Sequence, residues 1–150
     1  MPIIRKATES DIDAFILLAH EFYLEQTNFA HTEFDAYSVA ISFISYINSS
    51  KHVVFLAVID GELVGFLMAR TAKTLWGSDL EAHDGAFYVS RSARGNGFAG
   101  LLMSEYKAWA LSLGATPHVT VRADIDHEAT KGMLVKNGFE LLGFTMRAKV

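Results

Sequence analysis

Apolar positions follow two different spacings along this chain, and the two spacings predict its helices and strands. Apolar residues recur every three or four positions in several long segments, as on one face of a helix. The predicted helices cover residues 11–26, 34–48, 97–113 and 127–136. Runs rich in β-branched and aromatic residues predict strands over residues 3–7, 52–59, 62–70, 85–89, 117–123 and 139–149, the last as one strand or a pair.

The turn signals between these segments indicate how the elements are connected. Asp60-Gly61 separates two apolar runs and predicts a tight β-hairpin. The resulting order, about β-α-α-β-β-β-α-β-α-β, predicts an α+β domain with a mixed, mostly antiparallel sheet flanked by helices. We find no internal repeat, linker or low-complexity stretch, so residues 1–150 are interpreted as one domain.

Composition narrows the classes of function that need to be considered. The chain contains no cysteine, which excludes disulfide frameworks, thiolate zinc sites and cysteine nucleophiles, and indicates the reducing cytoplasm. Arg5 and Lys6 interrupt the N-terminal segment before a signal peptide could form, and no apolar run approaches the length of a membrane span. Basic residues are scattered, and the net charge is −4. We therefore expect a cytoplasmic protein with no membrane or nucleic-acid partner.

The most informative segment runs from Val89 to Gly100, where a predicted strand leads through small residues into a helix. Backbone N–H groups at a helix N-terminus form an anion site suited to phosphates, and Arg94 adds a cation. The glycines could instead serve only the geometry of a tight connection. Gly95 to Gly100 also spells G-x-G-x-x-G, the dinucleotide-binding fingerprint. That fingerprint normally opens its domain, so dinucleotide binding is the weaker alternative.

Two motifs give the chain a resemblance to a known family. Arg94-x-x-Gly97-x-Ala99 resembles the acetyl-CoA pyrophosphate loop of the GCN5-related N-acetyltransferase (GNAT) superfamily, and Lys136-Asn137-Gly138-Phe139 is similar to the motif that closes the family's next βα unit. The resemblance implies a GNAT-like fold and an acetyltransferase that uses acetyl-CoA as co-substrate. It implies that the coenzyme is held by the backbone of Phe87, Tyr88 and Val89 and by the loop Arg94, Gly95, Asn96, Gly97, Phe98, Ala99 and Gly100.

The family's chemistry implies direct transfer of the acetyl group to a primary amine of a small molecule, peptide or protein. Such an amine, with a pKa of about 10.4 for lysine, must first lose a proton to a base or a water relay. The family often places this base near the start of the strand before the glycine loop. Simple alternation puts Phe87, Gly85, His83 and Glu81 on one face, so His83 and Glu81 are the candidates, with Asp84 on the other face.

The chain departs from the family at the position of a frequent tyrosine that protonates the leaving thiolate. Leu134 stands there, and Tyr88 or a water molecule could supply the proton instead. The departure leaves open a non-catalytic CoA-binding or regulatory module of the same fold. We expect no metal, because His127-Glu128 begins an HExxH motif whose second histidine is replaced by Lys131.

The sequence does not identify the acceptor substrate. Four aromatic residues of the N-terminal region either line an acceptor pocket or belong to the core: Phe22, Tyr23, Phe29 and Phe34. The sequence also leaves open whether the acyl group is acetyl or longer. Dimers are common in the family, and the sequence does not decide the oligomeric state of this chain.

Overall fold

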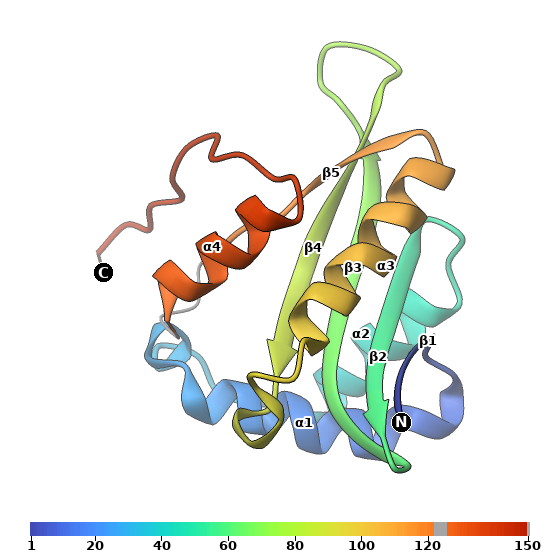
Figure 1. The fold of residues 1–150 in the computed structure, drawn as a ribbon, viewed down its shortest axis with the longest axis vertical. Helices are drawn as coiled ribbons and strands as arrows, with labels where there is room; N and C mark the ends of the chain where they lie inside the picture. Colours follow the sequence, from blue (N-terminus) through green and yellow to red (C-terminus); the bar gives the residue numbers. More distant parts are fainter. Residues whose placement is uncertain (122–125, 150) are drawn as a thin grey trace.

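The computed structural model describes residues 1–121 and 126–149, which form one five-stranded sheet with helices on both faces (Figure 1). The strands are β1 (Pro2–Lys6), β2 (His52–Ile59), β3 (Glu62–Lys73), β4 (Leu80–Val89) and β5 (Ala115–His118). The helices are α1 (Ile12–Glu25), α2 (Ala36–Ile47), α3 (Phe98–Ser112) and α4 (His127–Lys136). Short 3-10 turns lie at Glu9–Asp11, Thr27–Phe29 and Arg91–Ala93.

The strands lie in the sheet in the same order as in the sequence. Neighbouring strands from β1 to β4 are antiparallel, and β5 pairs parallel to β4. The predicted α+β class with a mixed, mostly antiparallel sheet is therefore confirmed. The Asp60-Gly61 turn connects β2 to β3 as predicted, with both residues at positive φ.

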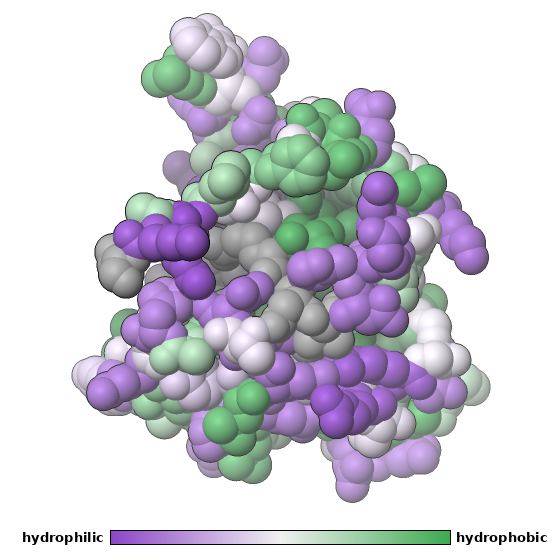
Figure 2. Space-filling view, turned by 90° about the vertical axis from the view of Figure 1, so that its left-hand side faces the viewer, coloured by the Kyte–Doolittle hydropathy of each residue, from purple (hydrophilic) through white to green (hydrophobic). Residues whose placement is uncertain are grey.

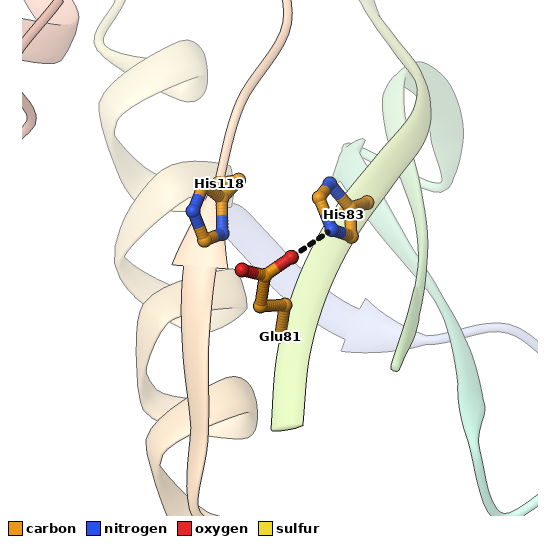
Figure 3. Close-up of side chains that lie close together, drawn as sticks. All are labelled: Glu81, His83 and His118. Atoms are coloured by element: carbon orange, nitrogen blue, oxygen red, sulfur yellow. Dashed lines mark hydrogen bonds and ion pairs between the residues drawn. The ribbon is translucent and has the colours of Figure 1, made fainter. Parts of the chain in front are cut away.

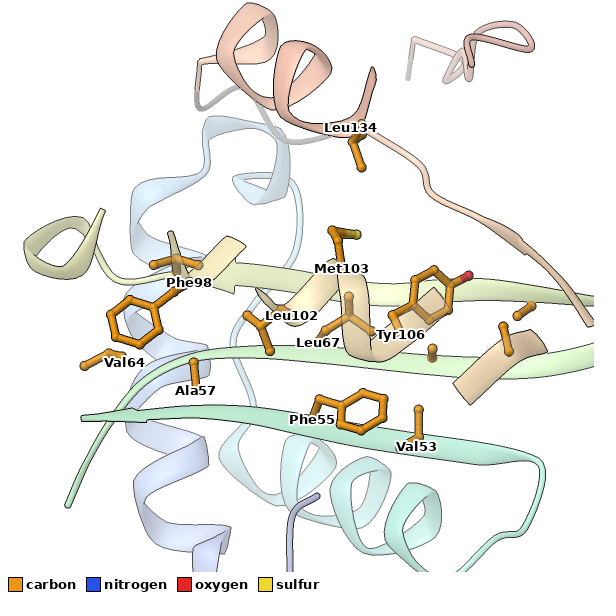
Figure 4. Close-up of a cluster of buried hydrophobic side chains, with 14 of the residues drawn as sticks. Val53, Phe55, Ala57, Val64, Leu67, Phe98, Leu102, Met103, Tyr106 and Leu134 are labelled. Atoms are coloured by element: carbon orange, nitrogen blue, oxygen red, sulfur yellow. The ribbon is translucent and has the colours of Figure 1, made fainter. Parts of the chain in front are cut away.

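Apolar side chains cover both faces of the sheet and form two clusters. Helix α3 packs on one face, where Phe55 and Leu67 of the sheet meet Leu102, Met103 and Tyr106 of the helix (Figure 4). Helices α1 and α2 cover the other face, around a second set of buried residues that includes Phe15, Phe43, Leu56 and Phe66. Strand β2 contributes to both clusters, which explains why its sequence is continuously apolar instead of alternating.

The predicted elements differ from the structure mainly at the ends of the strands. Strands β3 and β4 are longer than expected, because they pair with each other beyond Arg70 up to Lys73 and Leu80. The strand predicted over 117–123 is β5, which ends at His118, and residues 122 and 123 lie outside the described part of the chain.

The strand predicted over residues 139–149 is wrong. The described residues of this segment belong to no helix or strand, although the observed order follows the predicted one through α4. A β-prone composition forms a strand only where a neighbouring edge offers partners, and the outer strand β5 is only four residues long. The segment leaves four large apolar side chains exposed: Leu141, Leu142, Phe144 and Met146.

The surface on the α4 side of the molecule is mixed in character. Hydrophobic and hydrophilic side chains are interspersed on this face (Figure 2). Within the described residues, no helix combines the length and apolar character needed to cross a membrane.

Candidate active site

A cleft opens where β4 and β5 separate. The two strands pair only between Leu80–His83 and Ala115–His118, whereas β4 continues to Val89 (Figure 1). A cavity of about 640 Å³ lies at this separation, lined by residues 84–89 of β4, residues 119–121 after β5, the start of α3 and one side of α4. Its size is within the usual range of small-molecule sites.

The glycine loop closes one end of this cavity. Gly95 and Gly97 have φ values of 82° and 80°, a left-handed conformation that favours glycine. A Cβ atom at either position would have no neighbour within 4 Å, so both glycines also face open space. Helix α3 begins directly afterwards at Phe98, with no acidic residue in its first turn, so the N–H groups and the positive end of the helix dipole are uncompensated there.

The structure brings the predicted coenzyme-binding residues together. All of them except Asn96 line the cavity. The Asn96 side chain instead donates a hydrogen bond to the carbonyl oxygen of Ala93 at 3.1 Å, which supports the loop from within.

Arg94 lies in the loop as predicted, but its charge is already partnered. Its Nη1 and Nη2 atoms donate to the two carboxylate oxygens of Glu25 at 2.7 and 2.9 Å, and its Nε donates to the carbonyl oxygen of Val89 at 3.0 Å. Arg94 therefore ties the glycine loop to α1 and to the end of β4. Sequence reasoning missed Glu25, because it lies on a helix 69 residues earlier and belongs to no motif.

The carboxylate of Glu25 also binds Tyr88, together with that of Glu21. Its hydroxyl donates to Glu25 at 2.5 Å and to Glu21 at 2.9 Å. Burial raises the pKa of Tyr88 well above its ordinary value, and the hydrogen bonds to Glu25 and Glu21 raise it further. Tyr88 is therefore poorly suited to protonate a leaving thiolate. Leu134, at the position of the family's usual acid, is buried in the core.

The network predicts a pH-dependent cost for Glu25→Gln. The hydrogen bonds from Arg94 hold the pKa of Glu25 below its ordinary value of 4.5. The ionised Glu25 carboxylate therefore stabilises the fold fully above pH 4.5, and this stabilisation is lost as the pH falls through the lower pKa of the folded state. Near neutral pH, we expect the free energy of unfolding of Glu25→Gln to be lower than that of the wild type by about 1–2 kcal/mol. The variant loses charged hydrogen bonds at a partly exposed pair. Urea unfolding should show the difference from wild type shrinking below pH 4.5.

Glu62→Gln provides the control for this measurement, because Glu62 is exposed at the start of β3. A Glu25→Gln cost that equals the Glu62→Gln cost at neutral pH would show that the network contributes nothing to stability.

A bulge in β4 changes which side chains share a face. Met68 pairs with Ala86 and Ala69 with Asp84, so Gly85 has no partner in β3. The simple alternation that placed His83 with Phe87 is therefore wrong: His83 and Glu81 lie on the face of Ala86, toward α1 and α2. The hydroxyl of Tyr46, from α2, lies 3.0 Å from where a Cβ of Gly85 would be, so the bulge also lets α2 approach closely.

His83 and Glu81 meet a third residue that the sequence did not indicate. His83 Nε2 lies 3.0 Å from Glu81 Oε2, and the His83 ring stacks on that of His118 with centroids 5.0 Å apart (Figure 3). His118 was missed because it belongs to β5, next to His83 only through strand pairing. The three side chains place potential metal-ligand atoms within 4.8 Å of one another.

The candidate bases differ in their relation to the cavity. Neither Glu81 nor His83 lines it, although Asp84, the next residue, does. Asp84 accepts a hydrogen bond from the Thr120 backbone N–H at 2.9 Å and lies on the opposite face from His83.

The second predicted motif ends helix α4. Gly138 has a φ of 85°, and its N–H and that of Phe139 donate to the carbonyl oxygens of Val135 and Leu134, both at 3.0 Å. This is a Schellman ending, which needs a glycine at the left-handed position. Lys107 of α3 donates to the carbonyl oxygen of Asn137 at 2.7 Å, so the motif fixes α4 against α3 beside the cavity.

A smaller apolar hollow of about 330 Å³ lies between α1 and α2, over β3 and β4. We call it the aromatic hollow, after its six aromatic lining residues: Phe15, Phe22, Tyr23, Phe29, Phe34 and Phe66. The four aromatics that the sequence left undecided thus all line a hollow, and none of the four is fully buried.

Comparison with known proteins agrees with this geometry. The model of the acetyltransferase (GNAT) family matches residues 16–139. A solved structure of a transcriptional regulator from Bacillus halodurans C-125 is similar, with 17% identity, 100% of both chains covered and a TM-score of 0.82. A ribosomal-protein-alanine N-acetyltransferase from Brucella melitensis biovar Abortus 2308 has 16% identity over 100% of this chain and 97% of the other, with a TM-score of 0.78.

An aminoglycoside antibiotic 6'-N-acetyltransferase from Acinetobacter baumannii has 17% identity over 100% of this chain and 98% of the other, with a TM-score of 0.75. At these identities the structural likenesses support the fold alone. No protein of curated function matches the sequence.

Proposed function

Because the chain belongs to the GNAT acetyltransferase family, we propose that it is an acetyl-CoA-dependent N-acetyltransferase that acts on a primary amine. The observation that carries the proposal is that one cavity is lined both by the N-terminus of α3 and by the edge of β4. The N-terminus of α3, with no acidic residue in its first turn, suits a pyrophosphate. The part of the β4 edge that pairs with no described strand leads from there toward the aromatic hollow. Two of the similar structures are named as N-acetyltransferases of amine-bearing substrates. The absence of cysteine suits the cytoplasm.

The residues present fit the coenzyme in chemical character. The backbone N–H groups between Arg94 and Gly100 would hold the pyrophosphate, and the two left-handed glycines would let it approach. Among the described residues, the edge of β4 from Gly85 to Val89 pairs with no strand on the β5 side, and it would pair with the amide groups of the pantetheine arm. Bound acetyl-CoA supplies an activated acetyl thioester at the end of that arm.

The acceptor amine must lose a proton, and we assign this task to His83. Glu81 positions its ring through the 3.0 Å contact at Nε2, and the β4 bulge places both on the acceptor side of the sheet. A water molecule would carry the proton from the cavity to His83, because His83 does not line it. Asp84, which does line the cavity, is the second candidate.

The leaving group needs no protein acid in this proposal. Leu134 cannot donate a proton, and the hydroxyl of Tyr88 is engaged by two carboxylates. A thiol with a pKa of about 8.5 departs tolerably as its anion. The same observation favours the second candidate function, a CoA-binding module without catalysis, which would bind the coenzyme and release no thiol.

Thermal unfolding with and without acetyl-CoA tests coenzyme binding. At about 100 times its dissociation constant, a ligand adds about 2.7 kcal/mol of stability. For a chain of this size the midpoint should rise by about 5–10 °C. NAD serves as the control for the dinucleotide alternative, and a rise with NAD but not with acetyl-CoA would overturn the proposal.

A further inference from the structure

The aromatic hollow adjoins the large cavity. Phe22, Phe29 and Ala86 line both spaces. Ala86 follows the bulge residue Gly85 in β4. It lies toward the end of the Gly85–Val89 stretch that is farther from the glycine loop. A pantetheine arm extending from the loop along β4 would therefore bring its thioester to the junction of the two spaces. The hollow begins where the acceptor amine must lie.

The lining of the hollow contains no charged side chain among the described residues. Its hydroxyl groups belong to Tyr23, Ser38 and Ser42, and two of them already donate hydrogen bonds. Tyr23 donates to the carbonyl oxygen of Thr32 at 2.6 Å, and Ser38 to the carboxylate of Asp35 at 2.5 Å. The carboxylate of Asp35 behind Ser38 is already held by that hydroxyl and by the backbone N–H of Tyr37 at 3.0 Å. A second ammonium group in this space would lose water and meet no charged lining side chain, which is strongly unfavourable.

Two acidic side chains of α1 are already engaged by other groups. Glu25 is paired with Arg94 and Tyr88, and Glu21 accepts from Tyr88 and from Ser90 at 2.6 Å. At the junction itself, the rings of Phe22 and Phe29 lie edge to face with centroids 5.3 Å apart.

We infer that the acceptor is a monoamine with an aryl or alkyl body, which fills the aromatic hollow while its one amine lies at the junction. This inference rests on the proposed function and narrows it. Polycations, including aminoglycosides and polyamines, are then poor substrates, although aminoglycoside acetyltransferases share the fold.

The test compares octylamine with diaminooctane, the same carbon chain with an amine at each end. With acetyl-CoA saturating, we expect kcat/KM for octylamine to exceed that for diaminooctane by at least about 10-fold, because the second charge must enter the hollow. Phenylbutylamine should behave like octylamine, and spermidine and an aminoglycoside like diaminooctane.

A variant pair tests the location of the site. Ser42→Asp adds a carboxylate to the lining of the hollow and should reduce the preference for octylamine by about 10-fold. Ser45→Asp is the matched control: it lies on the same helix, is exposed and does not line the hollow, so the preference should not change.

The outcomes distinguish failure of the monoamine inference from failure of the proposed acetyltransferase function. Equal or better use of diaminooctane, spermidine or the aminoglycoside by the wild type would overturn the monoamine inference and leave the acetyltransferase proposal intact. If Ser42→Asp and Ser45→Asp had the same effect on the preference for octylamine over diaminooctane, the aromatic hollow would be excluded as the acceptor site. Absence of any acetyl-CoA-induced thermal shift would overturn the proposed function itself, and the inference with it.

Discussion

Gly97→Glu should abolish stabilisation by acetyl-CoA. Gly97 lines the cavity at the N-terminus of α3, and a side chain there enters space in which no atom lies within 4 Å. The added carboxylate would occupy the proposed pyrophosphate position and repel its charge. We expect the dissociation constant to rise by at least about 100-fold, since like charges in contact cost several kcal/mol. The thermal shift with acetyl-CoA should then disappear.

Gly61→Glu is the matched control for this experiment. Gly61 has a φ of 81°, also has no neighbour within 4 Å of its Cβ position, and lies in the β2–β3 turn outside the cavity. Both variants bear a similar backbone cost of about 1–2 kcal/mol for a left-handed residue. Gly61→Glu should therefore unfold at a lower temperature but keep the full shift with acetyl-CoA. An undiminished shift in Gly97→Glu would exclude the glycine loop as the phosphate site.

His83→Ala should reduce kcat/KM for the amine by about 10²–10⁴-fold, the usual contribution of a general base. The thermal shift with acetyl-CoA should remain, because His83 does not line the cavity. Glu81→Gln should have a smaller effect of about 10-fold, since Glu81 orients the ring without taking the proton itself. Initial rates of thiol release, measured with octylamine as acceptor, give these values.

Two further variants decide between the candidate bases. His127→Ala removes an exposed histidine outside the cavity lining and should leave kcat/KM unchanged. Asp84→Asn should also retain most of the activity if His83 is the base. A large loss in Asp84→Asn with normal rates in His83→Ala would transfer the role of base to Asp84.

Local patterns in the sequence predicted those parts of the molecule that depend on local chemistry. The Asp60-Gly61 hairpin, the glycine loop and the Lys136–Phe139 ending of α4 each consist of residues adjacent in sequence, and each forms as predicted. The helix boundaries follow for the same reason, because capping and apolar spacing are local properties.

Features that depend on distant partners could not be predicted in this way. The Glu25–Arg94 pair joins two elements far apart in sequence, and the contact of His83 with His118 depends on the parallel pairing of β4 with β5. The bulge at Gly85 shifts the alternation along β4, so simple alternation counted back from Val89 places His83 on the wrong face. Residues 139–149 have a β-prone composition but no paired edge, so composition alone predicted a strand that does not form.

Acetyl transfer by this protein is tested most directly by the release of free coenzyme A thiol from acetyl-CoA in the presence of octylamine, with mass spectrometry of the amine. We expect thiol and N-acetyl-octylamine to appear in equal amounts with the wild type, and neither to appear with Gly97→Glu. Binding of acetyl-CoA by the wild type with no thiol release above the buffer rate, for octylamine and for every other amine tested, would contradict this expectation. The chain would then be a CoA-binding module without catalysis.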